Sequence, residues 1–200
     1  MKTGPEKSND GEVVSAVLAG DTDRFAEIAD RYQASLLRVA RSRLGDPGRA
    51  EDAVQETFLS AFKSLHTYDS IYSFRTWLWT ILLNQCRRAA KKQAARKTVQ
   101  EIPDGDESSL RSAMPGPASL LLAKERAALL EDLLATLPES QADALRLRFF
   151  GNLKFQEIAD TMGCGLSTAK LRVRSGLTRI SAAMKEFAVP FDTEPPASRS

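Results

Sequence analysis

The chain has very few of the residues from which metal centres, disulfides and hydrolytic sites are built. Its 200 residues include one histidine, His66, and two cysteines, Cys86 and Cys164, which lie far apart in the sequence. No cluster of Cys and His has metal-ligand spacing, and no disulfide framework is indicated. A Ser-His-Asp or Cys-His arrangement cannot be assembled, and no glycine-rich phosphate loop is present. We therefore expect no enzyme, no metal or other cofactor and no small-molecule substrate.

Long hydrophobic runs and strand patterns are also missing. The longest apolar run, around residues 77–83, is far short of the roughly 20 residues that span a bilayer. The amino terminus, MKTGPEKSND, lacks the apolar core of a secretory signal. There are no alternating β-branched runs and no Asn-Gly or Asp-Gly turns between apolar segments. These absences predict an all-α protein that is not inserted in a membrane and works in the reducing cytoplasm.

Helical periodicity fills most of the chain, because apolar positions recur every three or four residues. It predicts a first helical domain over 11–97 and a second, with a helix-turn-helix, over 119–187. The segment 98–118 contains prolines, glycines and acids without periodicity, which predicts a flexible linker. The proline-containing segment 188–200 is expected to be a disordered tail.

Capping residues mark several helix ends in the first domain. Asp21 is expected to cap a helix over 22–44, and Gly45 to end it. Asp46, followed by Pro47, predicts the start of the next helix. The inward face of that helix is expected to carry a row of apolar and small residues, namely Ala50, Ala53, Val54, Thr57, Phe58, Ala61, Phe62 and Leu65.

The outward face of the same helix is acidic. It carries Glu51, Asp52, Gln55, Glu56 and an exposed Leu59. A solvated surface is the usual meaning of such a face. An apolar residue surrounded by carboxylates is also typical of a protein-docking patch, with a central anchor and a charged rim.

The charge of the chain is nearly balanced, at a formal +2, but strongly segregated. No acidic residue occurs from 70 to 100, and a polar stripe at i, i+3, i+4 and i+7 is formed by Asn84, Arg87, Arg88 and Lys91. Such a stripe can follow a phosphate backbone, and the amide of Asn84 has the donor and acceptor suited to an adenine edge.

Aromatic side chains lie in and around the loop before this stripe, which suits unstacked single-stranded bases. For Tyr72, Ser73 and Trp79, contact with bases and packing inside the protein remain equally compatible with the sequence. Phe74 and Trp77 are assigned to the core.

The segment FQEIADTMGCGLSTAKLRVRSGLTRI, residues 155–180, has the pattern of a helix-turn-helix. Gly163 is expected to end the first helix, Leu166 to plug the turn and Ser167 to cap the second helix. Ala169, Val173, Leu177 and Ile180 are expected to face inward. The side chains expected to reach DNA are Ser167, Thr168, Lys170, Leu171, Arg172 and Arg174.

The order AEDAVQETFLSAF, FRTWLWTILLN, a linker, LPESQADALRLRFF and FQEIADTMGCGLSTAKLRVRSGL resembles the extracytoplasmic-function group of bacterial sigma factors. The resemblance covers about residues 13–184. It implies an all-helical, two-domain subunit that binds core RNA polymerase, through the β′ clamp and the β flap, and directs it to promoter DNA. It also implies an anti-sigma factor as a partner, and a role in initiation without catalysis.

The resemblance also implies roles for the residues described above. The face of Glu51, Asp52, Gln55, Glu56 and Leu59 would dock on the clamp. The loop and helix with Tyr72, Ser73, Asn84, Arg87, Arg88 and Lys91 would open and read the minus-ten element, capturing an unpaired base. The helix-turn-helix would read the minus-thirty-five element. Leu171 stands where the family often has a polar residue, so the promoter sequence does not follow from the resemblance.

One further hypothesis fits the second domain alone. A free-standing helix-turn-helix regulator would bind duplex DNA as a dimer at a palindromic site. The chain shows no obvious dimerisation helix, and this hypothesis gives the first domain no purpose.

Overall fold

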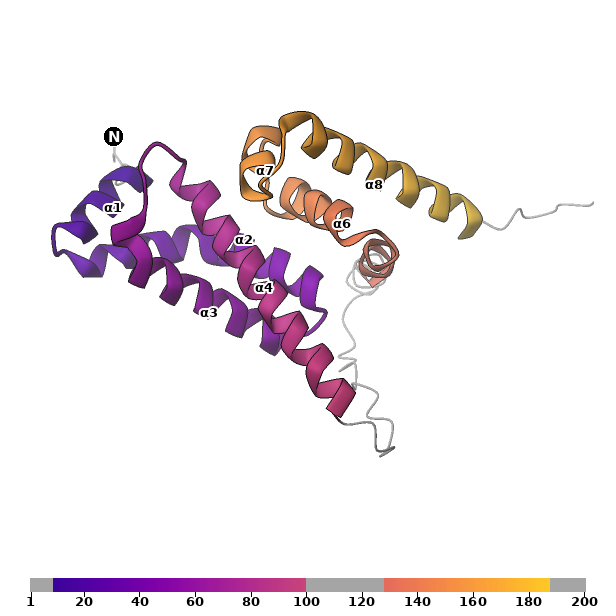
Figure 1. The fold of residues 1–200 in the computed structure, drawn as a ribbon, viewed down its shortest axis with the longest axis horizontal. Helices are drawn as coiled ribbons and strands as arrows, with labels where there is room; N and C mark the ends of the chain where they lie inside the picture. The colour runs from indigo at the N-terminus through magenta and orange to yellow at the C-terminus, as the bar shows by residue number, and fades with distance from the viewer. Residues whose placement is uncertain (1–8, 100–127, 188–200) are drawn as a thin grey trace, which may run out of the picture.

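In the computed structural model, residues 9–99 and 128–187 are described, and within these ranges the chain is helical without strands. Figure 1 shows two groups of helices, one from each of these ranges. The predicted all-α fold is confirmed. The predicted tail and nearly all of the predicted linker lie outside the described residues.

The first group is a helical bundle of three long helices and several short ones. Its elements are α1 (Asp10–Leu18), the 3-10 turn η1 (Thr22–Arg24), α2 (Phe25–Leu44), α3 (Pro47–Ser64), the 3-10 turn η2 (Leu65–Thr67) and α4 (Phe74–Val99). The helices α2, α3 and α4 pack on one another around a core in which Ile28, Leu36, Leu78, Leu82 and Leu83 are fully or almost fully buried. This bundle holds α3 and α4 side by side, so that their outer faces form one surface.

Two predicted helix boundaries of the bundle are confirmed. Gly45 ends α2 with a left-handed backbone, at a φ of 66°, which glycine adopts without steric cost. The carboxylate of Asp46 accepts a hydrogen bond from the backbone N–H of Arg49 at 2.7 Å, directly before Pro47 at the first helical position. These two signals together fix the tight reversal from α2 into α3.

The second group contains helical residues 128–135, α6 (Glu139–Leu145), the π-helical turn η3 (Arg146–Phe150), α7 (Phe155–Thr161) and α8 (Leu166–Phe187). Gly163 joins α7 to α8 with a φ of 60°, as predicted. Gly176 lets α8 approach α6 closely, since a Cβ at this position would lie 2.8 Å from Cδ1 of Leu145. The α7–turn–α8 unit is thus the predicted helix-turn-helix, supported from below by α6.

Five local predictions are wrong. Asp21 makes no side-chain capping hydrogen bond. The side chain of Leu166 is 38% exposed and does not fill the turn. The helix α8 begins at this residue, so Ser167 lies within the first turn and does not precede it. The backbone carbonyl of Gly165 accepts a hydrogen bond from the amide of Ala169. Phe62 and Leu177, expected to face inward, are more than 40% exposed.

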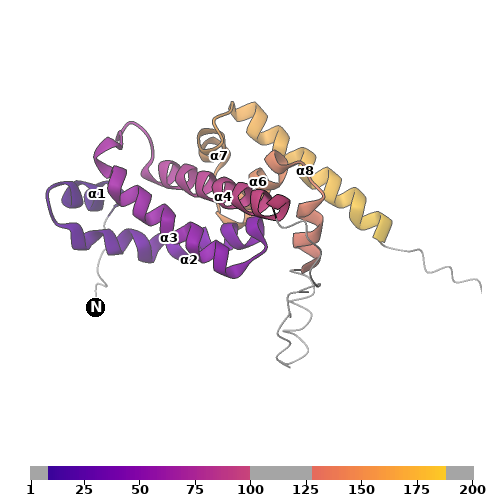
Figure 2. The ribbon, with the colours of Figure 1, turned by 60° about the horizontal axis from the view of Figure 1, so that its bottom comes forward.

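The two groups of helices pack directly against each other. In Figures 1 and 2, α4 lies between the rest of the bundle and the helices α6 and α7. Contacts join α4 to α7 and α2 to η3. Buried residues of both groups form one continuous core, which includes Trp79 of α4 and Leu147 of η3.

Candidate nucleic-acid and protein interfaces

The acidic side of α3 is exposed along its length. The side chains of Glu51, Asp52, Gln55, Glu56 and Leu59 all reach solvent, while the opposite side of the helix is buried. Leu59 is 43% exposed, and Phe62, one turn further on, adds a second exposed apolar side chain, whose ring lies 5.2 Å from that of Phe25 between centroids. We call this surface the α3 face. It has the anchor and charged rim of a docking patch.

A groove runs between α3 and α4, and both acidic and basic side chains line it. Asp52 and Glu56 line it from α3, and Arg88 and Lys92 line it from α4. Gln85 of α4 donates to the hydroxyl of Ser60 at 2.9 Å and holds the two helices together. The acidic α3 face and part of the basic stripe, which are separate motifs in the sequence, therefore share one cavity.

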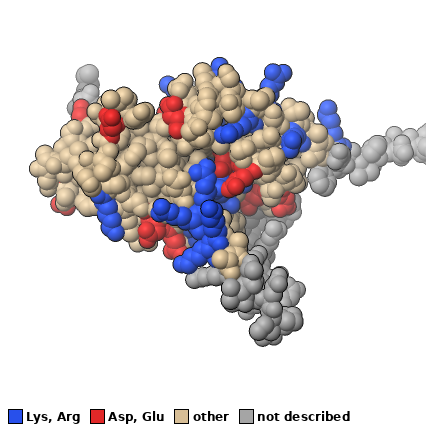
Figure 3. Space-filling view, in the orientation of Figure 1, with Lys and Arg blue, Asp and Glu red and all other residues tan. Residues whose placement is uncertain are grey.

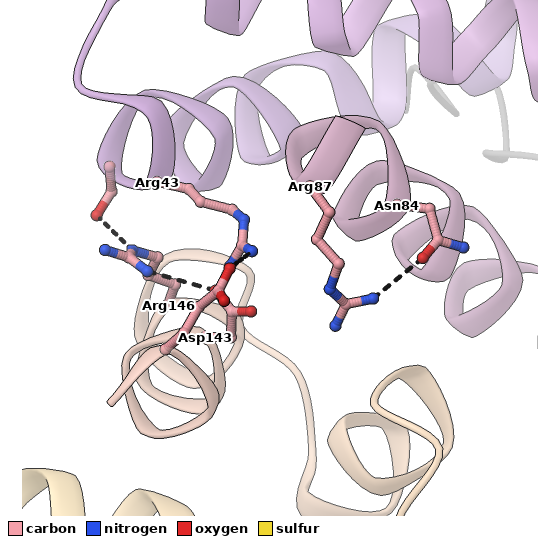
Figure 4. A network of polar contacts seen from close by, with 7 residues as sticks. Arg43, Asn84, Arg87, Asp143 and Arg146 are labelled. Atoms are coloured by element: carbon pink, nitrogen blue, oxygen red, sulfur yellow. Dashed lines mark hydrogen bonds and ion pairs between the residues drawn. The ribbon is translucent and has the colours of Figure 1, made fainter. Parts of the chain in front are cut away.

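The basic stripe of α4 divides between two sides of the helix. Arg88 lies in the groove with the α3 carboxylates. Arg87 instead donates to the side-chain oxygen of Asn84 at 3.0 Å, and Figure 4 shows this pair on the side of α4 that is turned toward the second group of helices. Lys91 is exposed. Basic side chains gather over α4 in the space-filling view of Figure 3, so the helix offers a broad cationic surface and not a single line.

The loop before α4 forms one wall of a cavity. Tyr72 is 65% exposed and Ser73 is exposed, and both line the cavity together with Tyr68, Ser70 and Phe74. The opposite wall comes from α1 and carries the acids Asp10 and Glu12. No sequence pattern predicts that α1 belongs to this site, because its residues lie about 60 positions away. The cavity has the aromatic and polar lining that suits an unstacked base.

The aromatic residues near this loop are either packed in the core or exposed to solvent. Phe74 is buried, and Tyr68 and Trp77 pack around it with ring centroids 5.5 and 5.6 Å away. Trp79 is fully buried. Of the residues for which base contact remained open, only Tyr72 and Ser73 are therefore accessible in this structure.

The outer side of α8 presents the side chains expected of a recognition helix. Ser167, Thr168, Lys170, Leu171 and Arg174 are exposed, and Arg172 is half-buried. Ala169 and Val173 are buried against the domain, as predicted. Leu171 is 62% exposed, which suits contact with an apolar group such as a thymine methyl.

At pH 8 a thiol-specific disulfide reagent is expected to react with one thiol per native chain, Cys164, and with both thiols after unfolding. Cys164 is half-buried, whereas Cys86 is fully buried in the core. Burial raises the pKa of the Cys86 thiol to about 11, so very little of the reactive thiolate exists at pH 8. The amount of chromophore released by the reagent measures the number of reactive thiols per chain. Rapid reaction of both thiols in the native protein would contradict the prediction.

The raised pKa of the Cys86 thiol also predicts a loss of folding stability in alkaline solution. The unfolded thiol ionises near pH 9, while the folded one keeps its proton to about pH 11. The contribution of the buried Cys86 thiol to the free energy of unfolding is thus complete below pH 9. It is lost as the pH rises toward 11, by about 1.4 kcal/mol per pH unit. Replacement of Cys86 by alanine should remove this part of the pH dependence.

Family models match most of the described chain. Residues 28–96 match Sigma-70 region 2, and residues 127–180 match Sigma-70, region 4. The two matches together cover more than half of the chain, and they fall on the two groups of helices described above. No helix among the described residues is both long and apolar enough to cross a membrane.

Curated relatives agree with these models. The chain is 27% identical over 173 residues to the ECF RNA polymerase sigma-E factor of Escherichia coli K12, which covers 84% of this chain and 90% of that protein. It is 25% identical over 185 residues to the RNA polymerase sigma-H factor of Pseudomonas aeruginosa, which covers 90% and 95%. The matches therefore span both helical groups and the segment between them.

Solved structures show the same fold. CnrH, in complex with the cytosolic domain of CnrY, superposes with a TM-score of 0.66 at 22% identity over 88% of this chain and 97% of that one. The sigma factor RpoE of Bartonella quintana, in complex with the anti-sigma factor NepR, gives 0.59 at 22% identity over 80% and 97%. With both family regions in order on one chain, and with relatives aligned along nearly its whole length, the protein belongs to the extracytoplasmic-function sigma factors of bacterial RNA polymerase.

Proposed function

We propose that this sigma factor docks on core RNA polymerase through the α3 face and reads promoter DNA through two separate surfaces. As a sigma factor it directs promoter recognition and transcription initiation; the proposal concerns which residues do so. The observation that carries it is the exposure of Glu51, Asp52, Gln55, Glu56 and Leu59 as one acidic face on a helix whose other side is buried. Glu51 pairs with Arg41 of α2 at 2.8 Å, but the face as a whole is turned to solvent and fits a basic partner such as the β′ clamp.

The minus-ten surface is formed by α4 and the loop before it. Tyr72 and Ser73 line the cavity that we propose for the captured base, and Asn84, Arg87, Arg88 and Lys91 supply base-edge and phosphate contacts. Asp10 of the α1 wall is engaged by Arg31 and Tyr32, whereas Glu12 is exposed and favours a base that presents an exocyclic amino group, because a carboxylate only accepts hydrogen bonds. This surface and the docking surface belong to the first domain, residues 11–97.

The minus-thirty-five surface is the outer side of α8, in the second domain at residues 119–187. Ser167 and Thr168 lie at the start of the helix, where short polar side chains and free backbone amides meet phosphates. Lys170, Leu171, Arg172 and Arg174 follow on the turns that enter a major groove. The β flap is the proposed polymerase contact of this domain, and residues 98–118 are the proposed connection.

The proposal also covers the partner that regulates the protein and its location in the cell. Sigma factors are not a family of catalytic enzymes, and we propose no reaction, metal or cofactor for this one. Of the two solved complexes, one contains CnrH with the cytosolic domain of CnrY, and the other contains the sigma factor RpoE with the anti-sigma factor NepR. We propose that this chain likewise pairs with an anti-sigma factor, and that it acts in the cytoplasm beside the polymerase.

Size-exclusion co-elution with bacterial core RNA polymerase tests the proposal first. A stoichiometric complex is expected at near-physiological salt. Selection of DNA from a random pool by that complex should then recover two sequence blocks at a fixed spacing, from which run-off transcripts begin. A folded monomer that does not bind polymerase, or a dimer that selects a palindrome, would instead favour the free-standing regulator.

A further inference from the structure

The loop before α4 presents one large apolar side chain to solvent. Ile71 is 83% exposed, more than any other large apolar residue in the part of the chain that the structure describes. A single exposed apolar residue is ordinary on a protein surface. The position of Ile71 is not ordinary, because this residue lies at the tip of a short turn, between two residues that line the cavity proposed for the captured base.

Three hydrogen bonds hold this turn. The backbone N–H of Ile71 donates to the carboxylate of Asp69 at 2.9 Å, and the N–H of Tyr72 donates to the backbone carbonyl of Asp69 at 3.1 Å. The hydroxyl of Tyr68 donates to the backbone carbonyl of Tyr72 at 2.5 Å. An aspartate side chain that accepts the amide two residues further on fixes the backbone of a turn. The side chain of Ile71 is therefore presented by an ordered backbone.

Both ends of the turn are anchored to the helical bundle. The ring of Tyr68 lies 5.5 Å from that of Phe74 and 5.4 Å from that of Trp77, between centroids, and Phe74 is buried. At the other end, the backbone carbonyl of Ser73 accepts the amide of Trp77 at 3.1 Å, in the first turn of α4. A load on Ile71 is thus carried by the bundle and is not absorbed by a loose loop.

The side chain of Ile71 lies beside the cavity and outside it. Ser70 and Tyr72 line the cavity, whereas Ile71 between them does not. Consecutive Cα atoms are about 3.8 Å apart, and successive nucleotides of one DNA strand are about 3.4 Å apart. A base that enters the cavity against Tyr72 therefore leaves its neighbour in the strand about one residue away, at Ile71.

A base that leaves the duplex also leaves a gap in the stack. The unstacking costs free energy, and it exposes the face of the neighbouring base to water. Proteins that distort DNA fill such gaps by inserting an apolar side chain between base steps. Isoleucine suits this task, because its branched side chain has few rotamers to lose and its apolar surface is removed from water when it is inserted.

We propose that Ile71 is a wedge that takes the place of the captured base in the DNA stack, and that Asp69 positions this wedge. Capture in the cavity and insertion of Ile71 are then two parts of one step, made by a single ordered turn. The inference rests on the proposed function, which places the captured base in the cavity. It adds a residue that acts on the opening of the duplex and not on the identity of the captured base.

Opening of two DNA templates by core polymerase carrying this chain tests the wedge. Both templates contain the selected promoter with 2-aminopurine in the minus-ten block; one is fully paired, and the other has that block mismatched and so already open. Ile71→Ser is expected to lower the equilibrium constant for opening the paired template about tenfold, because serine cannot fill the gap in the stack. Binding of the mismatched template should stay within about twofold of wild type, because no paired stack has to be broken.

Variants of the turn and of a distant residue provide the controls. Ile71→Leu keeps the apolar volume and should retain most of the opening. Asp69→Ala removes the acceptor of the Ile71 amide and should weaken opening of the paired template, whereas Asp69→Asn, whose side-chain oxygen still accepts, should restore it. Met184, which is 52% exposed near the end of α8, is the matched apolar residue. Met184→Ser should leave the opening of the paired template and the binding of the mismatched one unchanged.

Replacement of Tyr72 separates the wedge from the proposed function. Because Tyr72 lines the cavity, Tyr72→Ala should reduce binding of both the paired and the mismatched template. Normal binding of both templates by Tyr72→Ala would count against the capture cavity itself. A loss by Tyr72→Ala together with normal opening by Ile71→Ser would overturn the wedge alone.

Two further results for Ile71→Ser would also contradict the wedge. An equal loss on the paired and the mismatched template would mean that Ile71 contacts single-stranded DNA directly and has no separate part in opening. Loss of co-elution with core polymerase would place Ile71 in the surface that docks on the polymerase.

Discussion

Replacement of both Asp52 and Glu56 by arginine is expected to weaken binding to core RNA polymerase by at least about 100-fold, which corresponds to about 2.7 kcal/mol. Both side chains are exposed on the α3 face, so the change should leave the core intact. It replaces attraction to a basic partner with repulsion, and like charges at an interface cost several kcal/mol. Competition with a labelled wild-type chain for a limiting amount of polymerase measures the loss.

The control for this prediction carries the same change of charge elsewhere on the bundle. Asp23 and Asp30 are exposed on η1 and α2, and their joint replacement by arginine should leave polymerase binding within about twofold. A thermal unfolding curve shows whether each double variant is folded. Tight binding by the Asp52 and Glu56 variant would mean that the polymerase uses another face.

Replacement of Arg174 by alanine is expected to lower the affinity for the minus-thirty-five duplex about tenfold and to reduce the slope of log affinity against log salt by about one. Arg174 is exposed on the outer side of α8, and we propose that its guanidinium contacts the DNA backbone. Arg172 is half-buried nearer the domain. Its replacement should cost about 1–3 kcal/mol at one base position and relax specificity there, with a smaller change in slope.

Fluorescence anisotropy over a range of salt concentrations, with single-base variants of the selected block, distinguishes the two roles. Arg179 provides the matched control, because it is exposed on the same helix further from the turn. Its replacement by alanine should change neither slope nor specificity. If replacement of neither Arg172 nor Arg174 changes the salt slope or the base specificity, α8 is not the recognition helix.

The local signals of the sequence predicted the fold well. The rules that predict helix ends at Gly45, Asp46 and Gly163 depend on a few neighbouring residues only. The structure has the expected backbone at each of these positions. Asp21 and Ser167 follow the same rules, yet neither caps a helix as expected. The helix α8 begins at Leu166, one residue before the predicted cap.

Relations between distant segments could not be predicted. Arg43 and Asp143 form an ion pair although they are separated by 100 residues, and nothing in helical periodicity connects them. The same holds for the α1 wall of the base cavity and for the groove that α3 and α4 share. Sequence patterns locate the faces of single helices, whereas the sites depend on how those helices are placed beside one another.

The groove between α3 and α4 also links polymerase binding to DNA binding electrostatically. In the free protein, Asp52 and Glu56 lie across it from Arg88 and Lys92, so they screen part of the positive potential that α4 offers to phosphates. A basic partner seated on the α3 face would neutralise these carboxylates and leave the cations of α4 unscreened. The sigma factor would then attract DNA more strongly as part of the holoenzyme than alone, with no movement of the backbone.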